Sequence, residues 1–245
     1  VHMSERDSLI LWPYLEPLLE ESWTTLSAKY NYEPEGKTLI EVFEDTADFA
    51  VRSVGLPDIG PLVGICFGKV ITLISPDTLT ANWQEIVWHE FAHVITLQMT
   101  DNRIPRWLSE GISVWEEREG RSYWGRSQGL DLLRAAEEQK LLPIGDLNSG
   151  FSGAQNNADL SFAYFQSYLV VDYITETYGF NKLVDLIYEY GEIKEESERF
   201  RAAFDMSLNE FDGGFQRWID QRVQEINVYA HTEDVPDEGE GQRVY

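Results

Sequence analysis

The segment 88–93 reads W-H-E-F-A-H and places two histidines four residues apart, with a glutamate directly after the first. On a helix that turns by about 100° per residue, His89 and His93 lie about 40° apart on one face, so both imidazoles can reach one metal ion. Glu90 lies beside that face, where a carboxylate can contact a metal-activated water without being a ligand. The segment therefore predicts a helix with a hydrolytic metal site, around which the rest of the chain must fold.

The side chains around this motif are almost all apolar. The stretch 83–99 is apolar nearly all round, which is typical of a buried helix. Two imidazoles and a carboxylate inside such a helix are costly unless something satisfies them, and a divalent cation does so. The alternative is a chance match on an ordinary core helix, at roughly 1% for a chain of this length. The two remaining histidines, His2 and His231, lie near the ends of the sequence.

A third ligand is predicted in the next helix. After a loop that ends at Pro105, which can open a helix, the chain reads W-L-S-E-G. Glu110 follows His93 by 17 residues, which is enough for one helix to end and a second to return alongside it. Two histidines and one glutamate leave a fourth position for water, as in hydrolytic zinc sites. The alternative is a solvated surface glutamate. Glu117 lies on the same face and could orient a ligand, but an exposed glutamate is favoured there.

The charge of the chain excludes one class of function. The 245 residues include 43 acidic and 19 basic side chains, for a formal net charge of −24. Nucleic-acid binding driven by phosphate neutralisation needs clustered lysines and arginines, so it is excluded. An acidic surface attracts cationic substrates, although solubility or a salty habitat explains it more simply. There is no uninterrupted run of about 18 apolar residues, so no membrane span is predicted.

The single cysteine, Cys66, allows no intrachain disulfide and leaves the compartment open. The acidic composition together with the single cysteine favours a periplasmic or secreted bacterial location. Because a buried apolar thiol is the commoner state of a lone cysteine, Cys66 is not expected to bind the metal.

The N-terminal part of the chain is expected to contain one or two helices and a small sheet. Residues 4–30 carry apolar side chains at helical spacing, as one amphipathic helix or as a pair broken at Pro13 and Pro17. A strand is predicted at 38–43 and a helix at 46–54.

A hairpin is predicted directly before the metal helix. The β-rich runs 62–67 and 70–75 are separated by Gly68 and Lys69, which can form a tight turn. One strand could present its edge to an extended peptide as the upper wall of a substrate cleft, or the hairpin could be plain sheet.

The C-terminal part is expected to be almost purely helical. Between its helices, residues 142–157 are rich in Gly, Asn and Ser and predict a loop that could form a rim or lid. We expect a single domain over 4–230. Residues 231–245 are acidic and poor in apolar side chains, which predicts a disordered tail or a linker to an additional domain beyond it. The helices are predicted at 129–140, 158–178, 181–190, 195–205 and 208–227.

The run from Gly64 to Glu117 resembles the gluzincin metallopeptidases, especially the peptidase MA-like domain family. The residues that carry the resemblance are H-E-F-A-H at 89–93 and W-L-S-E-G at 107–111. The metal sites of the membrane alanyl and glycyl aminopeptidase families are similar, with a glutamate in a W-x-x-E-G setting as third ligand. Metzincins are set aside, because Thr96 and Met99 stand where that family has a glycine and a third histidine.

The resemblance implies a fold, a metal and a further residue. The fold is an α+β, thermolysin-like catalytic domain with a small N-terminal β-sheet lobe and a mainly helical C-terminal lobe. The metal is zinc, held by His89, His93 and Glu110. The run A-Y-F-Q-S at 163–167 resembles a Y-x-x-G/S stretch whose tyrosine supports the tetrahedral intermediate. This implies such a role for Tyr164, with Tyr168 as the rival and an ordinary core aromatic as the alternative.

The expected function is that of a zinc-dependent metallopeptidase, a hydrolase that cleaves peptide or protein substrates with a metal-activated water and Glu90 as general base. An endopeptidase is favoured. The strand 64–68 lacks the glutamate that grips a free amine in the alanyl aminopeptidase family, although a carboxylate from the 148–159 loop could replace it. The alternative function is a catalytically inactive module that binds metal or protein.

Overall fold

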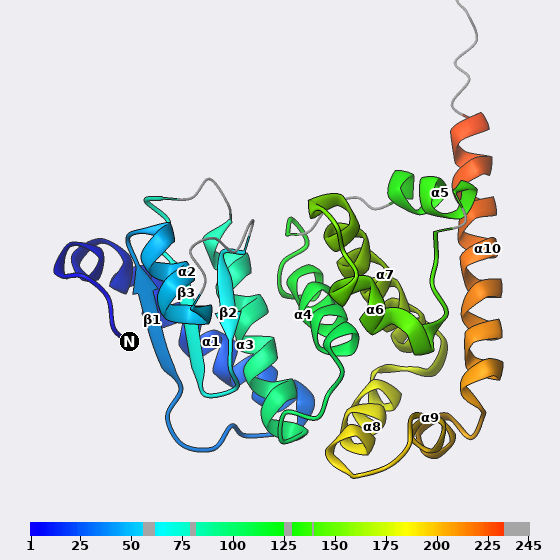
Figure 1. Ribbon diagram of the computed structural model, residues 1–245, viewed down its shortest axis with the longest axis horizontal. Coiled ribbons are helices and arrows are strands. Elements are labelled where there is room, and N and C mark those ends of the chain that lie inside the picture. The colour runs from blue at the N-terminus through cyan, green and yellow to red at the C-terminus, as the bar shows by residue number, and fades with distance from the viewer. Residues whose placement is uncertain (56–61, 79–81, 125–128, 139, 233–245) are drawn as a thin grey trace, which may run out of the picture.

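The computed structural model describes residues 1–55, 62–78, 82–124, 129–138 and 140–232. A small sheet with the N-terminal helices forms one side of the molecule and the C-terminal helices form the other (Figure 1). One large cluster of buried apolar side chains draws on both sides, so they share a core. The architecture is mostly helical with one small sheet, which is compatible with the predicted α+β class.

The first helix, α1 (Glu5–Tyr30), is continuous, so the first of the two predicted alternatives is correct. The Oγ atom of Ser4 caps its start by accepting a hydrogen bond from the Asp7 N–H at 3.1 Å. Pro13 and Pro17 lie on the exposed side, where water can satisfy the carbonyls that lose an N–H partner. From the middle of the helix onward, buried side chains recur on one face: Leu15, Leu18, Ser22, Leu26 and Tyr30.

The predicted strand, helix and hairpin are all present. Helix α2 (Thr46–Val54) has the predicted bounds. The hairpin turns at Gly68, whose φ of 78° lies in the left-handed region that glycine adopts at little cost. The strands are β1 (Leu39–Phe43), β2 (Gly64–Cys66), which is shorter than predicted, and β3 (Val70–Ile74). Strands β1 and β3 pair in parallel and β2 and β3 pair antiparallel, in the order β1-β3-β2, so β2 is an edge strand.

Two helices follow the hairpin. Helix α3 (Trp83–Met99) has the predicted bounds and is buried over most of its length. Asp101 and Asn102, with φ values of 50° and 60°, reverse the chain direction. Helix α4 (Arg106–Gly120) then packs against α3, with Pro105 as its N-cap residue. The expected return of a second helix alongside the first is therefore confirmed.

The C-terminal half is helical, as predicted. Helix α7 (Asn157–Tyr178) packs closely on α4 at Gly111. Only a glycine allows this approach, because a Cβ atom there would lie 2.5 Å from the Ser167 carbonyl oxygen. Ser207 and Glu210 form a capping box, in which the Ser207 N–H donates to the Glu210 carboxylate at 2.8 Å and the Glu210 N–H donates to Ser207 Oγ at 3.3 Å. The remaining helices are α5 (Gly129–Glu137), α6 (Leu147–Ser152), α8 (Phe180–Gly191), α9 (Glu196–Phe204) and α10 (Leu208–Thr232).

The prediction of a loop over 142–157 is wrong. This stretch contains a 3-10 turn (Ile144–Asp146) and helix α6, with Leu147 and Phe151 buried. The side-chain oxygen of Asn148 accepts a hydrogen bond from the Trp107 N–H at 3.1 Å and so satisfies the start of α4. One of the polar residues that suggested a loop, Asn148, thus joins α6 to the start of α4, and the apolar Leu147 and Phe151 bury the helix.

The chain ends in a long helix. Helix α10 ends at Thr232, two residues inside the predicted tail, and the rest of that prediction, 233–245, lies outside the described residues. Within the described part of the chain, no helix is both long and apolar enough to cross a bilayer.

Candidate metal centre

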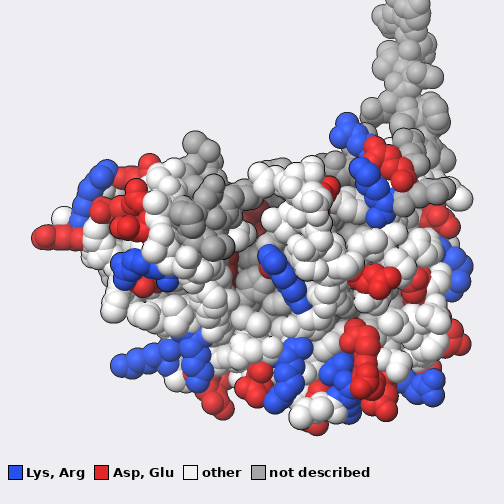
Figure 2. All heavy atoms as spheres, viewed as in Figure 1, with Lys and Arg blue, Asp and Glu red and all other residues white. Residues whose placement is uncertain are grey.

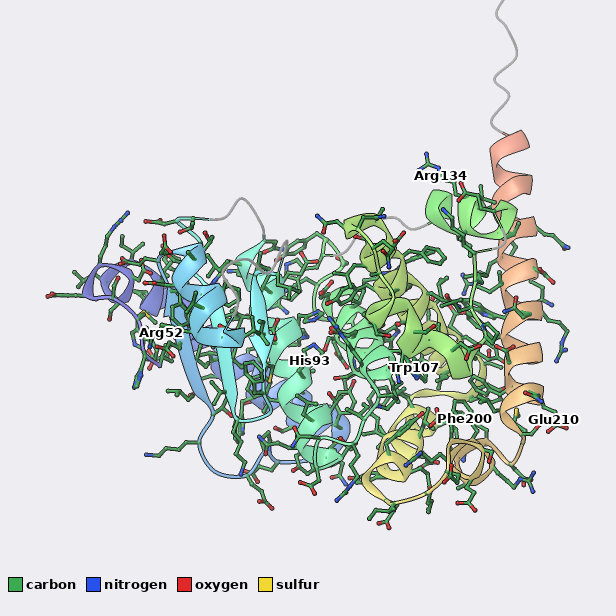
Figure 3. All side chains as sticks on the ribbon, in the orientation of Figure 1. Arg52, His93, Trp107, Arg134, Phe200 and Glu210 are labelled. Carbon is green, nitrogen blue, oxygen red and sulfur yellow. The ribbon has the colours of Figure 1, made fainter. Side chains whose placement is uncertain are left out.

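His89 and His93 lie on the side of α3 that is turned toward α4, and Figure 3 shows His93 between the two helices. Their Nε2 atoms are 3.1 Å apart and their ring centroids 4.8 Å apart. Two imidazole nitrogens this close repel one another through their lone pairs unless a proton or a cation lies between them. The four-residue spacing therefore brings the two nitrogens together as the sequence predicts.

Glu110 completes a triangle from α4. Its Oε2 atom lies 3.1 Å from His93 Nε2 and 3.4 Å from His89 Nε2. Three ligand atoms at about 2.0–2.1 Å from a tetrahedral ion are about 3.3 Å apart, so the spacings fit such an ion. Glu110 is 9% exposed, which rules out the alternative of a solvated surface residue. Among the described residues, these three side chains form the group whose ligand atoms converge in this way.

Each histidine is also held through its other ring nitrogen. His89 Nδ1 lies 2.6 Å from Glu117 Oε1, and His93 Nδ1 lies 2.8 Å from Ser109 Oγ. When Nδ1 carries the hydrogen and donates it, the lone pair of the ring lies on Nε2. These contacts therefore leave both Nε2 atoms free to act as ligands.

Two of these contacts depart from the expectations. Glu117 was favoured as an exposed residue, but it is half-buried against His89, because α4 crosses α3 with this face inward. Ser109 was not predicted as a site residue. Its only signal was its position next to Glu110, and its partner depends on how the two helices cross.

The charges at this cluster favour a cation. Burial lowers the pKa of His89, but the hydrogen bonds with Glu110 and Glu117 outweigh it and raise that pKa well above its usual value. Burial raises the pKa of Glu110, but the two histidines outweigh it and hold that pKa well below its usual value. The carboxylates thus stabilise a positive charge at His89. A divalent ion at the triangle suits the same field and competes with the proton.

Glu90 lies beside the triangle but is not part of it. It is 5% exposed, and its Oε2 atom is buried with no hydrogen-bond partner among the described residues. Burial raises the pKa of its carboxyl group. Strand β2 passes directly over it, since a Cβ atom at Gly64 would lie 2.6 Å from Glu90 Oε1. A buried carboxylate with an unused acceptor atom is suited to exchanging a proton with a bound molecule.

Tyr164 and Arg106 line the same pocket as the triangle. Arg106 Nε donates to the second oxygen of Glu110 at 3.2 Å, and its guanidinium lies 4.8 Å over the Phe151 ring. Burial raises the pKa of the Tyr164 phenol, which keeps its hydroxyl a hydrogen-bond donor. The rival Tyr168 is 2% exposed, packs under Arg118 and does not line this pocket. Arg106 was not predicted, because nothing local distinguishes it from a surface arginine.

A pocket of about 410 Å³ opens over the cluster. In the space-filling view it lies where the surface is hollowed between the two halves, and acidic atoms are visible in the hollow (Figure 2). Gly64, Ile65 and Cys66 of β2 line it, so the hairpin forms a wall of the cleft, as one of the two predicted alternatives has it. A pocket of about 780 Å³ between α5, α6 and α7 is larger, but no residue of the triangle lines it.

Cys66 lines the pocket but stands outside the group of converging ligand atoms. Burial raises the pKa of its thiol, which disfavours the thiolate that a metal would require.

A family model described as the Peptidase MA superfamily matches residues 62–221, which is more than half of the chain and includes every residue of the triangle. The comparison with curated protein sequences and the comparison with solved structures each gave no match.

Proposed function

Because the chain belongs to the Peptidase MA superfamily, we propose that it is a zinc-dependent peptidase of the gluzincin type that cleaves internal peptide bonds. His89, His93 and Glu110 would hold the metal, Glu90 would act as general base, and Tyr164 would stabilise the transition state. The supporting observations are the donor set of the triangle, its spacing and the pocket above it.

The observation that carries the proposal is the convergence of three lone-pair-bearing atoms within 3.1 to 3.4 Å of one another. Such a group is stable only with a positive charge at its centre. Two imidazole nitrogens and one carboxylate oxygen are the ligand set of many hydrolytic zinc sites, and they leave a coordination position open. The chemistry supplied by a bound zinc ion is Lewis acidity, which acidifies water and polarises a carbonyl group.

Glu90 would move the proton in this reaction. Its unpartnered Oε2 atom can accept a proton from a water molecule in the pocket, and its raised pKa lets it hold that proton. The same atom can then donate the proton to the amine nitrogen as the peptide bond breaks. General-base assistance of this kind contributes about 10²- to 10⁴-fold.

Tyr164 would bind the carbonyl side of the substrate, and Arg106 would position Glu110. The phenol hydroxyl of Tyr164 can donate a hydrogen bond to the oxygen on which negative charge develops. Arg106 holds Glu110 by its second oxygen and so leaves Oε2 directed at the histidines. Among the described strands, β2 lies at the edge of the sheet and lines the pocket, so an extended peptide could pair with it along the cleft.

Two observations favour an endopeptidase. Among the described residues that line the pocket, Glu90 and Glu110 are the carboxylates, and both have roles in the reaction. Asp159, a candidate to replace the missing amine-binding glutamate, instead accepts hydrogen bonds from the Gln155 N–H and the Asn156 side chain and lines the other pocket. Among the described residues of the cleft, a free ammonium group would therefore find no carboxylate besides Glu90 and Glu110.

The first experiment tests the metal and the chemistry together. Purified protein is analysed for metal content and offered an unfolded protein with and without a chelator. We expect one zinc per chain and chelator-sensitive cleavage. Glu90→Gln should keep the metal and lose about 10²- to 10⁴-fold in turnover. Metal without cleavage of any of many substrates would instead favour the inactive binding module, and absence of a transition metal would refute the site.

The second experiment tests the position of cleavage. A peptide and its N-acetylated twin are digested and the products identified by mass. Equal cleavage of both at an internal bond supports an endopeptidase. Release of single N-terminal residues from the free peptide alone would show an aminopeptidase.

A further inference from the structure

The first half of α1 presents an apolar face that no described part of the chain covers. Leu9, Ile10 and Tyr14 are 77%, 50% and 67% exposed, and Pro13 and Pro17 are exposed beside them. At about 100° per residue, these five positions fall within about 140° of one another around the helix axis. Single exposed apolar side chains are ordinary, but a continuous face of this kind marks an interaction site.

The burial of helix α1 differs between its two halves. Its second half packs on α3 and is buried at regular intervals, whereas its first turns extend beyond the edge of the sheet (Figure 1). Propensity alone stabilises a helical segment poorly, and Pro13 and Pro17 each remove a backbone donor. This segment would therefore be stabilised by a partner that buries its apolar face.

The charges at the two ends of the face suit a second copy of the same chain. Arg6 lies at one end and Glu20 at the other, 14 residues or about 21 Å apart, and both are exposed. In an antiparallel pair with a two-fold axis near Pro13, Arg6 of each copy faces Glu20 of the other. The same register sets Leu9 against Pro17. The face is thus self-complementary in charge, and two of its apolar positions meet in the same register.

We propose that α1 pairs with α1 of a second copy of this chain, as an antiparallel two-fold dimer over this apolar face. A lipid surface is the other occupant that an apolar helix face can suit. The acidic side chains Glu5 and Glu16 flank the face and disfavour anionic headgroups, whereas the Arg6–Glu20 pairs favour a second copy. One helix face is at the small end of stable interfaces, so we expect a dissociation constant on the order of 10 µM.

Sedimentation velocity on the whole chain tests the proposal. At about 0.15 M salt, where surface charges are screened beyond about 8 Å, we expect a concentration-dependent equilibrium between monomer and dimer. Leu9→Glu places a charge in the apolar face and should weaken the dimer at least about 10-fold. The matched control is Ile193→Glu, since Ile193 is 89% exposed and lies outside this face. The dissociation constant of this variant should equal that of the parent. Circular dichroism verifies that both variants are folded.

A charge reversal tests the register. Arg6→Glu and Glu20→Arg should each weaken the dimer, and the two together should restore it. Arg6 also pairs with Asp77 within the chain, so the recovery in the double variant carries the argument. Failure of that recovery overturns the register. A chain that stays monomeric, a dimer that persists in Leu9→Glu, or monomers that co-sediment with phosphatidylcholine–phosphatidylglycerol vesicles would each overturn the dimer.

Discussion

A methyl group added at Gly64 is expected to displace the proposed general base. A Cβ atom at this position would lie 2.6 Å from Oε1, 2.9 Å from Cγ and 3.0 Å from Cδ of Glu90. Non-bonded heavy atoms are comfortable at about 3.5 Å, so the carboxylate must move by about 1 Å. Because three atoms of a 5%-exposed side chain are involved, a rotation of the carboxylate alone cannot relieve the contact.

The expected consequence is a loss of turnover with the metal retained. A misplacement of about 1 Å in a reacting group can cost about 10²-fold in rate, or about 2.7 kcal/mol of transition-state stabilisation. The assay is the hydrolysis of an internally quenched peptide by zinc-loaded Gly64→Ala, with metal content measured on the same sample. Gly64 has no positive φ, so the substitution strains no turn and the protein should remain folded.

Two further variants separate this effect from a general loss of packing. In Glu90→Asp the side chain is shorter by one methylene and no longer reaches the new methyl group. Adding Gly64→Ala to this variant should therefore lower turnover much less than it does in the parent. The control is Gly213→Ala in α10, where the nearest atom to a new Cβ lies at 3.6 Å. It should leave activity unchanged and stabilise the helix by up to about 1 kcal/mol. Full activity in Gly64→Ala would refute the placement of Glu90 as the base.

Three other predictions concern a ligand, a buried contact and a titration. Glu117→Gln weakens the orientation of His89, so the affinity for zinc should fall about 10- to 100-fold in a chelator competition. Tyr30→Phe removes the 2.6 Å hydrogen bond to the Glu116 carboxylate, which is 1% exposed, so urea unfolding should show a loss of about 1–3 kcal/mol. Burial raises the pKa of Asp172 from 3.8 to about 6, so the parent loses stability between these two pH values as that carboxyl ionises. Asp172→Asn removes this loss and should be more stable at pH 7 by about 1–2 kcal/mol, a figure reduced for partial exposure to solvent.

Each of these has a control or a contrary result. Tyr188→Phe alters a tyrosine that is 45% exposed and should change stability by less than about 0.5 kcal/mol. Unchanged zinc affinity in Glu117→Gln would mean that the carboxylate does not orient the ring. If the stability of Asp172→Asn followed the pH dependence of the parent, another group would be responsible for it.

The sequence predicted the elements whose signals are local. The bounds of α2 and α3 follow from apolar periodicity and flanking polar residues, and they agree with the structure. The convergence of His89 and His93 follows from helical spacing alone, and only the turn at 100–105 was needed to add Glu110. An ambiguous local signal gave a wrong prediction. The polar residues of 142–157 predicted a loop, and the contact that stabilises helix α6 there could not be seen locally, because the hydrogen-bond partner of Asn148 lies 41 residues away in the chain.

Only the tertiary structure decided the surroundings of the triangle. Whether Glu117 faces His89 or solvent, and whether Ser109 reaches His93, depends on the angle at which α3 and α4 cross. The choice of Tyr164 over Tyr168 as the pocket residue depends on the rotation of α7 against α4, which is fixed by the close approach at Gly111. These relations join residues far apart in sequence through packing. A periodic pattern states which face of a helix is buried, and it does not state which side chain of another helix that face will meet.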